Sequence, residues 1–151
     1  MSVQTTQKAD AELVIQRVFN APRDLVFEMW TRKEHLDRWG CPEGMTIPVS
    51  EGDIRTGGWF RTCMRSSDGS EHWVSGQYRE ISPTERIVFT HAWDNETGER
   101  GHETVVTIAF SDTGDGRTRM HFHQAFFASQ ASRDGHAEGW NSCFDKLATL
   151  L

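Results

Sequence analysis

The chain contains no long apolar run. Its 151 residues include no stretch of about 18 consecutive apolar side chains, which a membrane-spanning helix requires. The first residues, MSVQTTQKADAE, are polar and lack the apolar segment of a secretory signal peptide. We therefore expect a cytoplasmic protein that does not insert into a membrane.

Cysteine is scarce, and its pattern argues against two classes of small protein. The three cysteines, Cys41, Cys63 and Cys143, are odd in number and widely spaced, without a CxxC pair. A disulfide framework needs paired cysteines, and a structural zinc site needs closely spaced ligands. We predict free thiols: Cys143 packs as a small hydrophobe, Cys63 faces outward, and Cys41, in a Gly-Cys-Pro turn, is the candidate for an exposed thiol.

Positive charge is in deficit, with a formal net charge of −6. This balance argues against nucleic acid or an anionic membrane surface as the main partner. The glycine-rich stretches at 57–58 and 114–116 fall in turns between strands, without the strand-to-helix context of a phosphate-binding loop. We expect neither nucleic acid nor a nucleotide as a ligand.

The seven histidines do not make a metal site in the sequence. Only His121 and His123 are spaced so that two ligands share one face of a strand, and no third ligand is placed with them. That face alternates with Met120 and Phe122, so it is expected to point to solvent. We predict no metal and no cofactor.

Tyrosine occurs once, whereas phenylalanine occurs nine times and tryptophan six times. This is a heavier load of apolar aromatics than the core of a domain this size requires. It favours a pocket lined with aromatic side chains.

The longest helical pattern runs from Ser129 to Leu151, with Ser129 suited to the N-cap. Side chains spaced by three or four residues share one helical face: His136, Trp140, Phe144, Leu147 and Leu151. Gly135 and Gly139 interrupt this helix, and each costs about 1 kcal/mol relative to alanine. They indicate either close packing of the helix on a sheet or a helix that forms the roof of a cavity.

The preceding residues show strand patterns with two short helices near the start. Residues 12–19 are predicted to form a strand, and 22–31 and 33–39 two helices. Six further strands are predicted at 45–54, 59–65, 71–81, 86–93, 102–110 and 118–127. We predict a flexible tail at 1–11 and one α+β domain over 12–151, in which a curved antiparallel sheet of six or seven strands wraps around the C-terminal helix.

Several segments resemble a known family. They are RVFNAPRDLVFEMWTRKEHLDRWG, GDIRTGGWFRTCMRSSDGSEHWVSGQYREISPTERIVFT and the terminal GWNSCFDKLATLL. The motifs are Ala21-Pro22, His35-Leu36 before Trp39, Gly57-Gly58, Asp68-Gly69 and Gly139-Trp140. Over residues 12–151 the chain resembles the heat-shock-protein-90 ATPase activator-like family of the START-related (SRPBCC) helix-grip superfamily. The superfamily also includes polyketide cyclases, aromatase-type proteins and plant lipid-binding allergens. The resemblance implies a helix-grip fold with a cavity between the sheet and the C-terminal helix.

Strand alternation and the helical stripe predict which side chains line such a cavity. Large aromatics and methionines with few polar groups suit a hydrophobic or aromatic ligand, such as a lipid or a polyketide. The candidates are Trp30, Trp39, Met45, Phe60, Met64, Tyr78, Phe89, His91, Trp93, Met120, Phe122, Gln124, His136, Trp140 and Phe144. Among them, His91, Gln124 and His136 are the polar groups that would orient a ligand.

Three functions follow from these patterns. The first is non-catalytic binding of a hydrophobic small molecule. The second is a cyclase-, dehydratase- or hydrolase-like enzyme with His91 as the candidate acid/base, in the cyclase-like variant with a histidine paired to Glu103 or Glu80. The third is a stress-response module that contacts a chaperone through an outer face carrying Trp59 and Trp73. The same two tryptophans would also suit a homodimer surface.

Overall fold

The computed structural model describes residues 12–151, so the predicted tail at 1–11 lies outside the described residues. The elements in chain order are β1 (Glu12–Phe19), α2 (Arg23–Thr31), α3 (Lys33–Trp39), β2 (Thr46–Asp53), β3 (Trp59–Arg65), β4 (Glu71–Ser82), β5 (Arg86–Trp93), β6 (Thr104–Asp112), β7 (Thr118–Ala125) and α4 (Gln130–Thr149). The order and type of these elements confirm the predicted α+β class.

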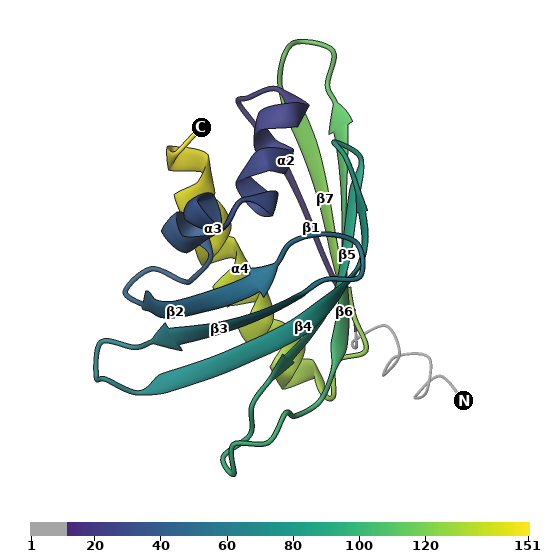
Figure 1. Ribbon diagram of the computed structural model, residues 1–151. Helices are drawn as coiled ribbons and strands as arrows, with labels where there is room; N and C mark the ends of the chain where they lie inside the picture. The colour runs from purple at the N-terminus through teal and green to yellow at the C-terminus, as the bar shows by residue number, and fades with distance from the viewer. Residues whose placement is uncertain (1–11) are drawn as a thin grey trace.

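One antiparallel sheet contains all seven strands, in the order β1-β7-β6-β5-β4-β3-β2. Figure 1 shows the sheet bending around α4, with α2 and α3 beside the upper part of that helix. This is the predicted helix-grip arrangement. Strand β2 forms one edge of the sheet, and its register with β3 shifts between Thr46 and Val49.

The hydrophobic core lies between the concave face of the sheet and the helices. In β1, Leu13 and Ile15 are buried whereas Val14 and Val18 are exposed, as strand alternation predicts. Full burial of an aliphatic or aromatic side chain contributes about 1.5–3 kcal/mol, so the inward positions supply most of the driving force for folding. The alternation therefore determines which face of the sheet receives α4.

Helix α4 begins at the predicted cap and is tied to the rest of the chain at its C-terminal half. The side chain of Ser129 accepts a hydrogen bond from the backbone N–H of Ser132 (3.1 Å). Near the other end, Nζ of Lys146 donates to the carbonyl oxygen of Cys41 (2.9 Å), and Arg17 of β1 forms an ion pair with Asp145 (2.6 Å). These contacts hold α4 against both β1 and the loop after α3.

Strand β7 ends two residues before its predicted boundary at Phe127. Phe126 has φ of 73°, a left-handed conformation that is uncommon for a bulky residue and leaves the extended strand. Its carbonyl oxygen accepts a hydrogen bond from Nε2 of His102 (2.5 Å). His102 itself lies before β6, which begins at Thr104 rather than at the predicted residue 102.

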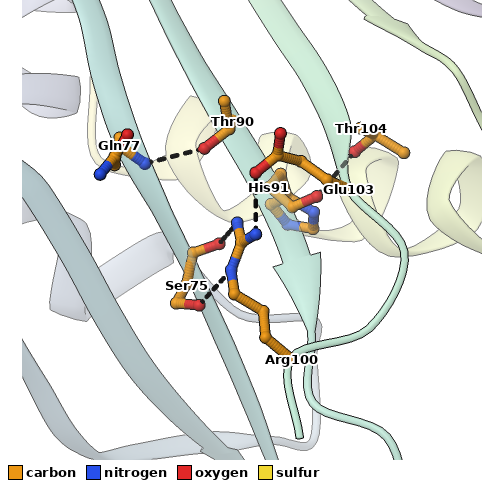
Figure 2. A network of polar contacts seen from close by, with 7 residues as sticks. All are labelled: Ser75, Gln77, Thr90, His91, Arg100, Glu103 and Thr104. Carbon is orange, nitrogen blue, oxygen red and sulfur yellow. Dashed lines mark hydrogen bonds and ion pairs between the residues drawn. The ribbon is translucent and has the colours of Figure 1, made fainter.

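The pairing of β4 with β5 is interrupted at Gly76, which lies opposite Phe60 in the regular pairing of β4 with β3. A Cβ on Gly76 would lie 1.7 Å from the carbonyl oxygen of Thr90 and 2.6 Å from the Phe60 ring. At the same place the backbone N–H of Gln77 donates to Oγ1 of Thr90 (2.9 Å), as Figure 2 shows. A glycine within a strand is typical of such close backbone approach. Gly76 therefore permits the local geometry next to His91.

We predict that Gly76→Ala lowers the free energy of unfolding by about 2 kcal/mol or more, because the new methyl group overlaps backbone as well as a ring. Urea denaturation measures this change. Gly135→Ala in α4 is the control, since its Cβ meets no heavy atom within 4 Å, and it should stabilise the protein by about 0.5–1 kcal/mol. A Gly76→Ala variant as stable as the wild type would contradict the prediction.

Candidate functional site

Two adjoining cavities lie between the sheet and the helices. The first, here called the sheet lobe, has a volume of about 120 Å³ and lies between α2, α3 and strands β2 to β5. The second, the helix lobe, has a volume of about 360 Å³ and lies between α4 and the loop after α3. Gly40, Met64, His91 and Trp140 line both lobes. The two lobes therefore form one candidate site with a shared wall.

Most of the predicted lining residues lie on these lobes. The sheet lobe has Trp30, Trp39, Phe60, Tyr78 and Phe89 on its walls. The helix lobe has Met45, Trp93 and His136. Predicted residues that line both are Met64, His91 and Trp140. Strand β3, strand β5 and helix α4 thus bring the aromatic side chains together.

Four predicted lining residues do not reach the cavity: Met120, Phe122, Gln124 and Phe144 are fully buried and line neither lobe. The reason is the short distance between α4 and β7. The ring of Phe122 lies 4.8 Å from that of Trp140 and 5.4 Å from that of Phe144, so these rings pack against each other. These four side chains point to the concave side of the sheet, as predicted, but they lie behind the residues that line the cavity.

Apart from Trp39, the part of the wall formed by α3 and β2 was not predicted from the sequence. Leu36 and Ile47 line the sheet lobe there, and a polar group lies beside them. Asp37 accepts from Nζ of Lys33 (2.8 Å) and from Oγ of Ser50 (2.7 Å), which ties α3 to β2. The irregular register of β2 hides its inward positions from an alternation argument.

A chain of buried hydrogen bonds runs from α4 across the sheet. Nε1 of Trp140 donates to Oε1 of Gln124 (2.8 Å), and Nε2 of Gln124 donates to Oγ1 of Thr104 (2.8 Å). Thr104 in turn donates to the carbonyl oxygen of His91 (3.0 Å), a bond visible in Figure 2. Because an indole N–H can only donate, the orientation of the Gln124 amide is determined.

His91 is held without charge beside this chain. Nε2 of Gln124 lies 3.5 Å from Nδ1 of His91, so Nδ1 is the acceptor and the ring proton is on Nε2. Burial, assisted by His136 and Arg100, lowers the pKa of His91 to about 3. The Arg100 guanidinium bridges Oγ of Ser75 (2.9 Å) and Oε2 of Glu103 (2.8 Å), as Figure 2 shows.

His136 has both ring nitrogens in hydrogen bonds. Nδ1 lies 2.7 Å from the carbonyl oxygen of Ser132 and donates to it, while Nε2 accepts from Nε1 of Trp93 (3.1 Å). The predicted histidine–carboxylate pair is wrong. Glu103 binds Arg100 (2.8 Å), and Glu80 binds Ser82 (2.7 Å). The cavity therefore contains no carboxylate that orients a histidine for acid/base chemistry.

Trp30 presents the least satisfied polar atom of the site. Its indole nitrogen is buried, and among residues 12–151 it is the only buried side-chain nitrogen or oxygen without a hydrogen-bond partner. The neighbouring Trp39 differs, because its Nε1 donates to the carbonyl oxygen of Met29 (3.0 Å). An unpaired buried donor in a native structure calls for an explanation.

All three cysteines are free and buried, so the expectation of an exposed Cys41 is wrong. Cys63 does lie on the convex face, opposite Met64, but its cross-strand partners Val49 and Trp73 flank it on that face. Burial raises the pKa of each thiol, in Cys143 to about 12. None of them is a favourable nucleophile.

The two tryptophans that were predicted to face outward differ in how far they are exposed. Trp59 is 46% exposed, whereas the ring of Trp73 is partly buried beneath the guanidinium of Arg61, 3.9 Å from its centroid. On the same convex side, His123 binds Glu12 (2.8 Å). Within residues 12–151 no group of three or more potential metal ligands occurs.

The model of the family described as "Activator of Hsp90 ATPase homolog 1-like protein" matches residues 20–151. The chain belongs to this family. Among solved structures, the chain is similar to an AHSA1 protein from Silicibacter pomeroyi, with 27% identity, a TM-score of 0.84, and coverage of 92% of this chain and 96% of that one. It is also similar to a protein from Chromobacterium violaceum, with 26% identity, a TM-score of 0.85 and coverage of 93% and 96%.

A Mycobacterium smegmatis protein, 20% identical with a TM-score of 0.80 over 95% of this chain and 92% of that one, shares the fold. No curated protein matches the chain. None of the helices in the described part of this family member is long and apolar enough to cross a membrane.

We predict that His91 makes stability fall on acidification. Its folded pKa of about 3 lies below the unfolded value near 6.5, so the unfolded chain binds the proton more readily. The contribution of uncharged His91 to the free energy of unfolding is complete above pH 6.5. It is lost between about pH 6.5 and 3, by at most about 1.4 kcal/mol per pH unit. Urea unfolding at about pH 7, 6 and 5 measures it. His91→Phe should lose less stability over this range, and equal losses in both proteins would refute the assignment.

Proposed function

We propose that this protein binds a small hydrophobic or aromatic molecule in the two-lobed cavity and does not catalyse a reaction. The supporting observation is an apolar, aromatic lining over both lobes, interrupted by few polar groups. Pockets of this composition bind ligands through apolar area and use a small number of polar groups for orientation. His91 is such a group, because it lines both lobes, whereas the N–H of Trp140 is already bonded to Gln124.

The glycines of α4 support the same proposal. Gly135 and Gly139 line the helix lobe, and a Cβ on Gly135 would meet no heavy atom within 4 Å. Close packing of helix on sheet therefore does not account for Gly135. A missing side chain here leaves volume in the cavity, although each glycine costs about 1 kcal/mol of helix stability.

The chemistry of the lining favours binding over catalysis. The interior histidines have no carboxylate partner, and burial raises the pKa of all three thiols. Ligand binding by helix-grip proteins such as polyketide- and lipid-binding members is the corresponding function in the superfamily that the sequence resembles. Because the fold alone does not determine function, the proposal is based on the residues that line the cavity.

The partners expected from the sequence stay predictions. Three free cysteines are typical of a reducing compartment, which supports cytoplasmic localisation.

The family description concerns activation of the Hsp90 ATPase, and the exposed Trp59 is the residue through which a chaperone or a second copy would be contacted. Pull-down of Hsp90 by the wild type but not by Trp59→Ser would support contact with a chaperone. A concentration-dependent dimer that is lost in Trp59→Ser would support contact with a second copy.

The first experiment is native mass spectrometry of the purified protein, followed by thermal-shift measurements with fatty acids, polyketide-like aromatics and isoprenoids. A co-purified molecule, or saturable stabilisation by one class, would support the proposal. A ligand-free mass combined with no stabilisation by any of the three classes would contradict it.

Gly135→Leu should abolish the ligand-induced thermal shift while leaving the unliganded protein folded. The leucine side chain projects into the helix lobe, where the Cβ has free space, and it raises helix propensity. Glu138→Leu is the matched control, because Glu138 is exposed on the same helix and lines neither lobe. Thermal shifts that remain equal in both variants would exclude the helix lobe as the binding site.

A further inference from the structure

One nitrogen of the buried His91 ring remains open to the cavity. His91 is only 5% exposed, and it lines both lobes. Within residues 12–151, Nδ1 lies 3.5 Å from Nε2 of Gln124, whereas Nε2 of His91 makes no hydrogen bond. In the same range, Nε1 of Trp30 is the only unpaired side-chain nitrogen or oxygen that is closed off entirely, so Nε2 of His91 retains accessible surface. Because His91 faces the concave side of the sheet, that surface belongs to the cavity.

Helix α4 determines which ring nitrogen of His91 carries the proton. Nε1 of Trp140 can only donate, so Oε1 of Gln124 accepts from it (2.8 Å). The amide nitrogen of Gln124 therefore points the other way, toward Thr104 (2.8 Å) and Nδ1 of His91. An amide N–H does not face another N–H, so Nδ1 is the unprotonated nitrogen. Burial lowers the pKa of His91 to about 3, and the neutral ring then carries its single proton on Nε2.

The His91 ring is also fixed in direction. Its centroid lies 5.7 Å from those of Trp93 and His136 and 5.9 Å from that of Trp140. A rotation that brought Nδ1 to the cavity would break the contact with Gln124 and displace packed rings. His91 is thus a donor whose direction is set by the fold.

The hydroxyl groups of the lining behave differently. Thr62 and Tyr78 line the sheet lobe, and Ser132 lines the helix lobe. A hydroxyl can turn to donate or to accept, so these groups suit either kind of ligand. His91 cannot adapt in this way, and it therefore distinguishes a ligand that accepts a hydrogen bond from one that only donates.

The lining supplies no free positive charge for an anion. In the sheet lobe Lys33 is paired with Asp37 at 2.8 Å, and the other charged residue there, Glu51, is negative and exposed. Among residues 12–151, no lysine, arginine, aspartate or glutamate lines the helix lobe. A buried carboxylate or phosphate without a partner is strongly disfavoured, so the acceptor belongs to an uncharged molecule.

We propose that the cavity selects an uncharged cyclic or aromatic compound with a hydrogen-bond acceptor, such as a carbonyl oxygen, that binds Nε2 of His91, and rejects analogues that can only donate there. The apolar body of the ligand packs against Met64 and Trp140, which line both lobes with His91. The acceptor lies at the wall between the lobes and sets the orientation of the ligand. This inference rests on the proposed function, since it specifies the ligand of the same cavity.

The test uses three tricyclic probes of nearly equal shape: 9-fluorenone only accepts a hydrogen bond, carbazole only donates one, and fluorene does neither. Equilibrium dialysis against the full chain should show 9-fluorenone binding about threefold to tenfold more tightly than fluorene, the range expected for one net hydrogen bond. Carbazole should lack this advantage, because its N–H cannot pair with the N–H of His91. The anion 9-fluorenone-4-carboxylate should bind more weakly than 9-fluorenone.

His91→Phe should remove the advantage of 9-fluorenone over fluorene while retaining a ring of similar size. Tyr78→Phe is the matched control, because it removes a hydroxyl from the sheet lobe and leaves His91 in place. The advantage of 9-fluorenone should remain in Tyr78→Phe.

Spectra of the wild type labelled with ¹⁵N-histidine test the donor directly, whether or not His91→Phe folds. The ring signals of His91, assigned by through-bond correlation, should report a neutral ring protonated at Nε2. The Nε2–H signal should move downfield with 9-fluorenone and not with fluorene or carbazole.

The outcomes separate this inference from the proposed function. A His91 ring protonated at Nδ1, a preference for carbazole or for the carboxylate, or an advantage of 9-fluorenone that persists in His91→Phe overturns the inference. Equal binding of the three neutral probes also overturns it and leaves cavity binding standing. Absence of binding by every probe overturns the inference alone when a lipid or isoprenoid stabilises the protein, and both proposals when no class does.

Discussion

The hydrogen bond from Trp140 to Gln124 joins the helix to the sheet at the centre of the molecule. It continues through Thr104 to the backbone of His91, so α4, β7, β6 and β5 share one buried polar chain. Every member is satisfied, and such fully satisfied networks specify one arrangement of a core. The aromatic rings around Trp140 can then leave a cavity on one side without the helix shifting to fill it.

The hydrogen bond from Trp140 to Gln124 also explains why the cavity is asymmetric. Near β7 the rings of Phe122 and Trp140 are in contact, with 4.8 Å between centroids. Toward β3 and β5 the rings of Phe60 and Phe89 line open space. The bent sheet and the helix therefore meet along one side and separate along the other.

Much of the fold could be predicted from the sequence because each element carries a regular pattern. Strand β1 has its predicted bounds, and so do β3, β5 and α3, where alternation or helical spacing is uninterrupted. The ends of β6 and β7 were less accurate, since the left-handed Phe126 and its bond from His102 depend on tertiary contacts.

The candidate site was only partly predictable for a related reason. Alternation gives the direction of a side chain but not the distance to what it faces, so Phe60 and Phe122 have equivalent patterns and different surroundings. Cys63 shows the same limit on the convex face, where its neighbours cover an outward side chain. The unpaired nitrogen of Trp30 and the uncharged state of His91 arise from three-dimensional packing, which no local pattern encodes.

Edge strand β2 has a consequence for how copies of the protein behave at high concentration. Pro48 lies within this strand and has no backbone N–H, and the register with β3 shifts between Thr46 and Val49. An exposed edge with a missing donor and an irregular backbone is a poor template for a further strand. This edge of the sheet is thereby protected against edge-to-edge aggregation.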